Sequence, residues 1–143
     1  MPDLTDEARL REAIELLYFG YREFTAGPDR ILAERGLNRV HHRILYFIGR
    51  NDPVSVSELL AILDVTKQAL HGPLKQLVRL DLVSNEPSDR DRRVKQLRLT
   101  ATGRRLERRL TGTQMALLSS VFEATGATAA QGWRAVMDAL KHR

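Results

Sequence analysis

Four consecutive residues in the second half of the chain, Arg90-Asp91-Arg92-Arg93, have side chains well suited to bind another molecule. Guanidinium groups donate hydrogen bonds to phosphate oxygens, and they also enter the minor groove of DNA, where the negative potential is concentrated. Taken alone, the stretch is also typical of a solvated charged loop. Its interpretation therefore depends on the elements that position it.

The segments on either side of the arginines alternate between polar and apolar residues. This alternation predicts two paired strands over residues 82–87 and 94–100, joined by a tip at Ser88–Arg93. The whole stretch 84–103 is then a β-hairpin with a charged tip.

A pair of short helices is predicted just before this hairpin. Ser55-Val56-Ser57-Glu58 fits a capping box, which begins a helix that ends near Leu63 with Leu59, Leu60 and Leu63 inward. Asp64-Val65 is a tight link, and Thr66 can cap the next helix, Lys67–Leu80. Two helices joined by so short a turn are typical of a helix-turn-helix, although helical hairpins that do not bind DNA are also common.

The second of these helices has a polar face rich in hydrogen-bond donors. Gln can bind adenine by two hydrogen bonds, and Lys can reach guanine or phosphate. Gly72-Pro73 interrupts this helix, because proline lacks the amide that would bond to the Ala69 carbonyl, so we expect a kink near Ala69–Pro73 or a restart at Pro73. Leu70, Leu74 and Leu77 are expected to pack inward. The residues expected on the exposed face are Thr66, Lys67, Gln68, His71, Lys75 and Gln76.

Longer helices are predicted on both sides of this central part. The first covers residues 4–26 and ends at Gly27-Pro28; a short helix over 29–35 stops at Gly36, and a buried helix follows over Asn38–Arg50. The first helix has an apolar stripe that suits either a partner helix or an ordinary core. The stripe consists of Leu10, Ile14, Leu17, Tyr21 and Phe24.

After the hairpin, Thr100 is expected to cap a helix from about Ala101 to Ala124, which Gly126 ends. Thr128-Ala129-Ala130-Gln131 is a candidate capping box for the last helix. That helix is expected to bury Trp133, Val136, Met137 and Leu140.

Positive charge is concentrated in one segment. The net charge is +5, but residues 67–109 contain twelve Lys and Arg against five Asp and Glu, so the remainder is slightly acidic. This distribution suggests one surface that faces a polyanion. The chain has no cysteine, which excludes disulfides and thiolate zinc sites. No apolar run is long enough to cross a membrane, and the acidic start Met1–Glu7 is unlike a signal peptide, so we expect a cytoplasmic protein.

Over nearly its whole length the sequence resembles the multiple-antibiotic-resistance regulator (MarR) family. The resemblance rests on residues 55–60, 63–68 and 77–83, and most specifically on Asp91-Arg92-Arg93 followed by Leu99-Thr100-Ala101-Thr102-Gly103. It implies a mainly α-helical fold with a small β-hairpin, a winged helix-turn-helix flanked by N- and C-terminal dimerisation helices. The corresponding regions are 1–36, 37–100 and 101–143.

The resemblance also implies a function, namely a homodimeric transcription regulator, most often a ligand-responsive repressor, that binds a pseudo-palindromic double-stranded operator. Arg93 would enter the minor groove with Asp91 positioning it, and Arg90 and Arg92 would lie near phosphates; otherwise Asp91 and Arg93 form an exposed ion pair of about 0–1 kcal/mol. A small aromatic effector would bind between the helices, unless the residues there are purely structural. The candidates for that site are Tyr18, Tyr21, His41, His42, Arg43 and Tyr46. In two places the chain departs from the family pattern, with Asp81 where glycine is common and with Gly72-Pro73.

The residues also allow other functions. A strongly bent second helix would favour a winged-helix module that binds proteins without direct base contacts. The sequence contains no His-Glu-x-x-His, phosphate-binding or nucleophile-elbow motif, so no cofactor, metal or enzymatic activity is expected. The adjacent histidines His41 and His42 point about 100° apart on a helix and cannot readily bind one metal ion together.

Overall fold

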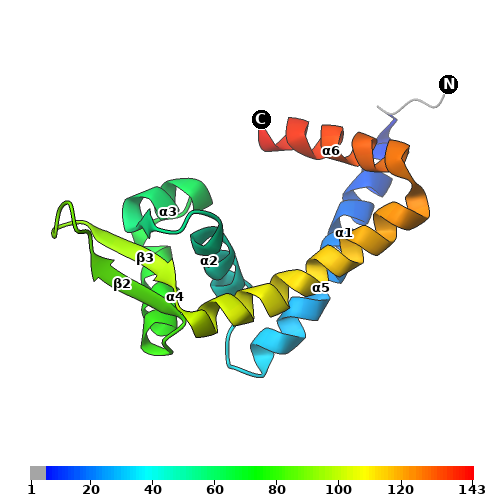
Figure 1. Ribbon diagram of the computed structural model, residues 1–143. Helices are drawn as coiled ribbons and strands as arrows, with labels where there is room; N and C mark the ends of the chain where they lie inside the picture. Colours follow the sequence, from blue (N-terminus) through cyan, green and yellow to red (C-terminus); the bar gives the residue numbers. More distant parts are fainter. Residues whose placement is uncertain (1–5) are drawn as a thin grey trace.

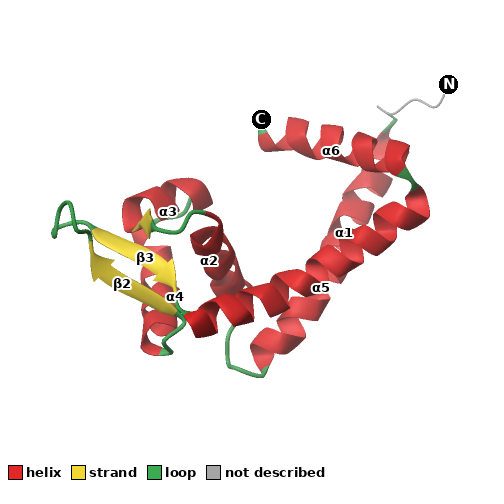
Figure 2. Ribbon diagram, in the orientation of Figure 1, coloured by secondary structure: helices red, strands yellow, loops and turns green. Residues whose placement is uncertain are grey.

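The computed structural model describes residues 6–143, which are mostly helical with one small sheet (Figures 1 and 2). The predicted fold class, a mainly α-helical winged helix with a β-hairpin, is confirmed. The predicted N-terminal region begins at residue 1 and the predicted first helix at residue 4, and both of these starts lie outside the described residues. The elements in chain order are α1 (Glu7–Ala33), α2 (Arg39–Arg50), β1 (Val54–Ser55), α3 (Val56–Leu63), α4 (Lys67–Arg79), β2 (Val83–Pro87), β3 (Lys95–Leu99), α5 (Ala101–Thr125) and α6 (Ala127–Lys141).

The sheet is antiparallel with the order β1-β3-β2. β2 and β3 form the predicted hairpin, in which Val83 pairs with Leu99. β1 was not predicted, because two residues are too short to show an alternating pattern; Val54 pairs there with Leu97. Since β1 directly precedes α3, this third strand ties the hairpin to the helix pair.

One hydrophobic core holds α2, α3, α4, the sheet and the start of α5 together. Leu45, Ile48, Leu59, Leu77 and Leu97 have no exposed surface. Each fully buried aliphatic side chain contributes roughly 1.5–3 kcal/mol to folding. We call residues 37–103 the winged region, since they contain this core almost entirely.

α1 is one continuous helix, so the predicted end at Gly27-Pro28 and the separate helix over 29–35 are wrong. Pro28 has no amide hydrogen to donate to the carbonyl of Phe24, but the side-chain amide of Gln114 on α5 donates to that carbonyl at 3.3 Å. Gly27 allows α5 to approach, because a Cβ there would lie 3.1 Å from the Thr113 hydroxyl. The neighbouring helix therefore replaces the missing bond, which the sequence of α1 alone does not reveal. α1 ends at Ala33, and Gly36 adopts a positive φ of 69° in the turn that follows.

The start and the packing of α6 also differ from the prediction. Its N-cap is Gly126, without a side-chain cap, so the predicted capping box at Thr128 is wrong. No residue of α6 is buried, and Trp133, Val136 and Leu140 are 44%, 63% and 54% exposed. Met137 is half-buried. The predicted burial of this helix is thus wrong for the single chain.

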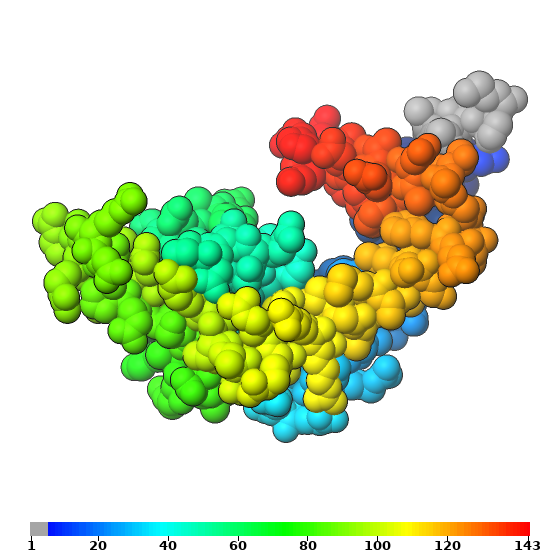
Figure 3. Space-filling model, in the orientation of Figure 1, coloured from blue at the N-terminus to red at the C-terminus, as the bar shows by residue number. Residues whose placement is uncertain are grey.

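The sheet and α6 lie at opposite ends of the molecule (Figure 1). α1 and α5 run side by side, and α6 follows α5 at the end away from the sheet (Figure 1). In the space-filling view a hollow separates the atoms of α6 from those of α2 and α3 (Figure 3). None of the helices between residues 6 and 143 combines the length and the apolar character that crossing a membrane requires.

Candidate functional site

The helix pair is built as the sequence predicts. Ser55 Oγ accepts a hydrogen bond from the amide of Glu58 at 3.1 Å, and the Glu58 carboxylate accepts one from the amide of Ser55 at 3.0 Å. Asp64 ends α3 in the left-handed conformation with φ of 53°. Thr66 Oγ1 then accepts from the amide of Ala69 and caps α4. Both helix starts are therefore fixed by local hydrogen bonds, which set the angle at which α4 leaves the turn.

α4 presents a polar face to solvent. The exposed side chains include Lys67, Gln68, His71 and Lys75, on the side opposite the buried Leu70, Leu74 and Leu77. Within residues 6–143 these four polar side chains form no ion pair with another side chain. Thr66 is also exposed, but its hydroxyl is occupied as the cap.

Pro73 lies inside α4 without ending it. The helix is continuous from Lys67 to Arg79, so the predicted restart at Pro73 is wrong. The Ala69 carbonyl loses its intrahelical donor, but Ala69 is exposed and water can supply one. The proline therefore leaves the polar face of α4 on one helix.

Gln76 lies apart from the other predicted α4 contacts. It is half-buried, and its Oε1 is 2.9 Å from Nε2 of His41 on α2. His41 is only 4% exposed. The structure thus directs this glutamine toward the protein interior.

Asp81 takes over the helix-ending role of glycine. Its φ is 59°, a conformation that favours glycine but that aspartate tolerates better than most residues. The amides of Asp81 and Leu82 donate to the carbonyls of Val78 and Leu77, both at 3.0 Å. The hydroxyl of Thr100 donates to the Asp81 carbonyl at 2.7 Å, which joins the end of α4 to the start of α5.

The Leu99–Gly103 motif has a steric basis. Thr100 Oγ1 caps α5 by accepting from the amide of Gly103 at 2.9 Å, as predicted. A Cβ at position 103 would lie 1.9 Å from the carbonyl oxygen of Leu82. Only glycine lets α5 begin this close to the chain that enters the hairpin.

The tip of the hairpin holds one arginine in a defined pose. Arg93 donates through Nε to Oδ1 of Asp91 at 3.1 Å and through its terminal nitrogen to Oδ2 at 3.3 Å. The backbone amide of Arg93 donates to Oδ1 as well. These contacts lower the pKa of Asp91 below its usual value, chiefly through the guanidinium. The Arg93 side chain remains 90% exposed, so it is oriented and still accessible.

The rest of the tip is arranged by Ser88. This residue is buried, its amide donates to the Val94 carbonyl at 2.8 Å, and its hydroxyl accepts from the amide of Arg90. Arg90 and Arg92 are exposed on the same tip. The sequence had not indicated that Ser88 closes this turn.

A carboxylate anchors the base of the hairpin. Asp52, whose side chain is 16% exposed, pairs with Arg98 on β3 at 3.2 Å and with Arg104 on α5 at 3.3 Å. Sequence reasoning missed this residue, because its partners lie 46 and 52 positions away.

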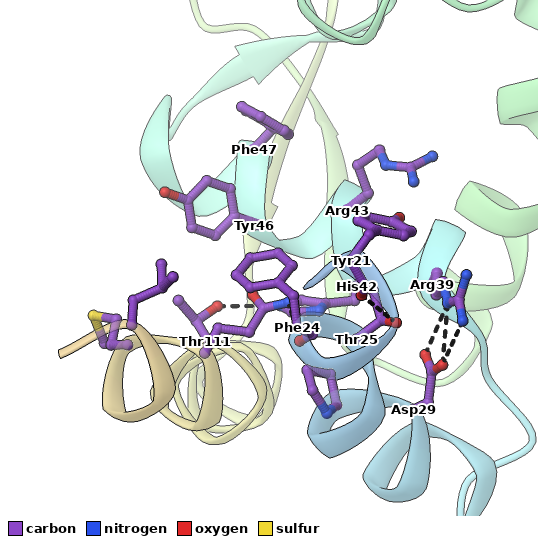
Figure 4. Close-up of a pocket in the computed structure, with 14 residues that line it drawn as sticks. Tyr21, Phe24, Thr25, Asp29, Arg39, His42, Arg43, Tyr46, Phe47 and Thr111 are labelled. Carbon is purple, nitrogen blue, oxygen red and sulfur yellow. Dashed lines mark hydrogen bonds and ion pairs between the residues drawn. The ribbon is translucent and has the colours of Figure 1, made fainter. Parts of the chain in front are cut away.

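A cavity of about 460 Å³ lies between α1, α2 and α5 (Figure 4). Four of the six predicted effector residues line it, whereas Tyr18 and His41 do not. The predicted lining residues are Tyr21, His42, Arg43 and Tyr46. The ones that prediction missed are Phe24, Thr25, Pro28, Asp29, Arg39, Phe47, Thr111, Gln114, Met115 and Leu118.

Polar groups in this cavity are partly paired. Arg39 and Asp29 form an ion pair at 3.0 Å (Figure 4), while Arg43 is exposed. His42 Nε2 is 3.2 Å from the hydroxyl of Thr111, which donates to Glu107. Burial lowers the pKa of His42, although the nearby carboxylates of Glu107 and Asp29 oppose the shift. His42 is therefore mainly neutral at pH 7. The cavity as a whole has aromatic walls and the guanidinium of Arg43 at its rim.

No metal centre accompanies these groups. Across residues 6–143, no three His, Asp or Glu side chains gather closely enough to hold a metal ion.

Comparisons with known proteins agree with this architecture. The profile described as the MarR family matches residues 35–94, which span α2 to the tip of the hairpin. The HTH-type transcriptional regulator PetP of Rhodobacter capsulatus is 42% identical over 137 residues, which cover 96% of this chain and 82% of the relative.

Solved structures share the fold at low sequence identity. Streptococcus pneumoniae FabT in complex with DNA has a TM-score of 0.82 at 19% identity, covering 93% of this chain and 95% of that one. Staphylococcus aureus MarR in complex with salicylate and kanamycin has a TM-score of 0.77 at 24% identity, covering 96% and 93%. With the capped helix pair, the Asp91–Arg93 contact and the Thr100–Gly103 junction, the identity to the regulator PetP shows that this chain belongs to the MarR family of transcription regulators, which are not enzymes.

Proposed function

We propose that the chain is a homodimeric, sequence-specific regulator that binds double-stranded DNA, with α4 in the major groove and the hairpin tip in the adjacent minor groove. The observation that supports this proposal most strongly is the pair of hydrogen bonds between Arg93 and Asp91 at the hairpin tip, where the Arg93 side chain remains exposed. An arginine that serves only solubility needs no such orientation. A narrow minor groove is where an oriented guanidinium gains the most electrostatic energy.

The exposed face of α4 supplies the base contacts in this proposal. Gln68 suits adenine, Lys67 and Lys75 suit guanine or phosphate, and His71 lies between them on the same exposed side. Arg90 and Arg92 contact phosphates beside the minor groove. The continuity of α4 through Pro73 favours DNA binding over a module that binds proteins without base contacts.

The helices outside the winged region serve dimerisation in this proposal. Leu10, Ile14 and Leu17 on α1 are 49%, 67% and 52% exposed, and the apolar face of α6 is equally open. Apolar surface of this extent on a soluble regulator marks an interface between proteins. Two copies joined there place two α4 helices about 34 Å apart on a pseudo-palindromic site.

The cavity between α1, α2 and α5 is the proposed effector site. Aromatic walls and an accessible guanidinium suit a small aromatic ligand, and the S. aureus neighbour was solved with salicylate. A ligand wedged between α1, α2 and α5 would displace the winged region from the dimerising helices and release the operator. The proposed role is accordingly ligand-responsive repression in the cytoplasm.

Selection of duplexes from a random pool, followed by affinity titration, tests the proposal. We expect a pseudo-palindrome with half-sites one helical turn apart and an affinity that falls steeply with salt. Arg93→Ala should weaken binding to the selected duplex by about 5- to 100-fold. Arg35→Ala, an exposed arginine in the turn between α1 and α2, is the matched control and should bind like the wild type. Binding indifferent to salt, or unchanged in Arg93→Ala, would refute the mechanism.

A further inference from the structure

We propose that His41 is a positioning residue that fixes the second half of α4 through Gln76. This inference rests on the proposed DNA-binding function. It also assigns Gln76 to the interior of the protein, in place of the base contact that its sequence position suggests. The proposal follows from the geometry of one side-chain pair and from the weakness that Pro73 introduces into α4.

The hydrogen-bond roles of His41 are determined by its surroundings. Nδ1 accepts a hydrogen bond from the amide of Asn38 at 3.0 Å, where His41 completes the capping box of α2. A neutral imidazole carries one proton, so Nε2 holds it and donates to Oε1 of Gln76 at 2.9 Å. Both ring nitrogens are thus occupied, and the ring is almost fully buried.

Gln76 lies on the part of α4 that most needs an external anchor. Pro73 removes the backbone hydrogen bond that would link its turn to Ala69. Residues after the proline are therefore held to the first turns of α4 by one bond fewer than in an uninterrupted helix. The bond from His41 restrains this second half, including Lys75 on the exposed face.

The same turn of α2 is fastened to α1. Arg39, two residues before His41, pairs with Asp29 on α1. His41 consequently joins α4 to a turn whose position is set by the long N-terminal helix. Loss of the Nε2 hydrogen of His41 would let α4 shift within the major groove of the bound DNA. Contacts with the bases would then be lost, while the positive charge of the protein would stay the same.

Two variants at position 41 separate the two roles of the imidazole. In His41→Asn the side-chain oxygen can replace Nδ1 as the cap acceptor, but the side chain is too short to reach Gln76. In His41→Gln the longer amide can replace Nε2 as the donor to Gln76. Gln76→Met removes the acceptor while retaining length and flexibility.

Affinity is measured against the duplex that the wild type selects and against an unrelated duplex. We expect His41→Asn and Gln76→Met each to weaken binding to the selected duplex by about 3- to 10-fold, with no additional loss in the double variant. Binding to the unrelated duplex should stay the same, and His41→Gln should remain within about twofold of the wild type. A role in stability alone would lower the unfolding temperature without changing the ratio of the two affinities.

Other outcomes overturn the inference. If Gln76→Met changes the preferred base at one position, or if the losses of the single variants add, Gln76 contacts DNA. Wild-type affinity in His41→Asn would also refute the positioning role, and a wild type that binds no duplex would remove the proposed function itself. Nitrogen NMR of the wild-type imidazoles gives a check that needs no variant. We expect the Nε2–H tautomer at His41, and an Nδ1–H tautomer would contradict the proposal.

Discussion

The hydrophobic side chains of the winged region and those of the helices outside it differ in their burial. Leu45, Leu59 and Leu97 of the winged region are fully buried within a single chain. Trp133, Val136 and Leu140 of α6 and Leu10, Ile14 and Leu17 of α1 remain about half exposed or more in that chain. The core of the winged region is thus closed within one chain, with Leu32, Leu106 and Leu110 of α1 and α5 completing it. In the proposed dimer, the exposed apolar side chains of the outer helices are covered by the partner.

The starts of the helices show a similar division, although the long helices also contain polar contacts such as that of Gln114 with the Phe24 carbonyl. In the winged region the side chains of Asp52, Ser55, Thr66, Asp91 and Thr100 each have identified partners that fix a turn, a cap or an ion pair. α6 begins at Gly126 without any side-chain cap. We therefore expect the stability of the winged region to be independent of protein concentration. The stability of α6 and of the outer parts of α1 and α5 should depend on protein concentration.

The largest expected effect tests the junction between β2, β3 and α5. Gly103→Ala places a methyl group on the Leu82 carbonyl, so the backbone must move, and we expect a loss of at least about 3 kcal/mol of stability. Gly112→Ala on the same helix has open space and should be neutral or stabilising by up to about 1 kcal/mol. Denaturant titration of both variants measures this contrast. Equal behaviour would show that α5 can move away from the hairpin without cost.

The next effect compares the two kinds of hydrophobic residue directly. Leu45→Ala should lower the free energy of unfolding by about 2–5 kcal/mol at every protein concentration. Leu140→Ala should lower the unfolding temperature mainly at micromolar concentrations, where the proposed dimer is populated. Thermal scans over a hundredfold range of concentration separate the two. A Leu140→Ala effect that does not depend on concentration would assign α6 to the fold of the single chain.

Most of the correct sequence predictions concern structure that is fixed by neighbouring residues, although the local capping box predicted at Thr128 is wrong. Several of the wrong ones concern structure that depends on distant residues. The caps at Ser55, Thr66 and Thr100 are local and were predicted correctly. Gly27-Pro28 was wrongly taken as a helix end, because the compensating donor, Gln114, lies on α5.

The same physical distinction applies to the candidate site. The exposed arginines of the tip follow from the hairpin pattern, but Ser88 and Asp52 act through tertiary contacts that no spacing encodes. The cavity was predicted in part, because the family resemblance indicated an effector site near Tyr21 and His42. Thr111 and Leu118 enter it only because α5 packs against α1 and α2. Gln76 appeared to be an exposed base contact until the position of His41 was known.

A smaller effect concerns the orientation of the hairpin within the winged region. Asp52→Asn removes the charge that Arg98 and Arg104 share, and we expect a loss of at most about 1 kcal/mol of stability because both arginines are about half exposed. Affinity for the selected duplex should fall by up to about threefold at low salt. Asp89→Asn, an exposed carboxylate on the tip, serves as the charge-matched control. Equal affinities in the two variants would show that Asp52 acts only through net charge.

The smallest effect lies where the winged region meets the long helices. Burial places the pKa of His42 below its ordinary value of 6.5, so the unfolded chain takes up this proton first as the pH falls. Stability should therefore decrease below about pH 6.5 and level off below the folded-state pKa. Denaturation at pH 7.5 and 5.5 should show a smaller difference in His42→Gln than in the wild type. An identical difference would mean that His42 is accessible to water in the folded protein.

Sedimentation of the protein with duplexes that carry one or two selected half-sites tests the central claim most directly. We expect a dimer of the free protein at micromolar concentration and two protomers on a duplex whose half-sites lie about 34 Å apart, with far weaker binding to a single half-site. A monomer that binds one half-site as tightly as two would contradict the division into a DNA-binding winged region and dimerising ends.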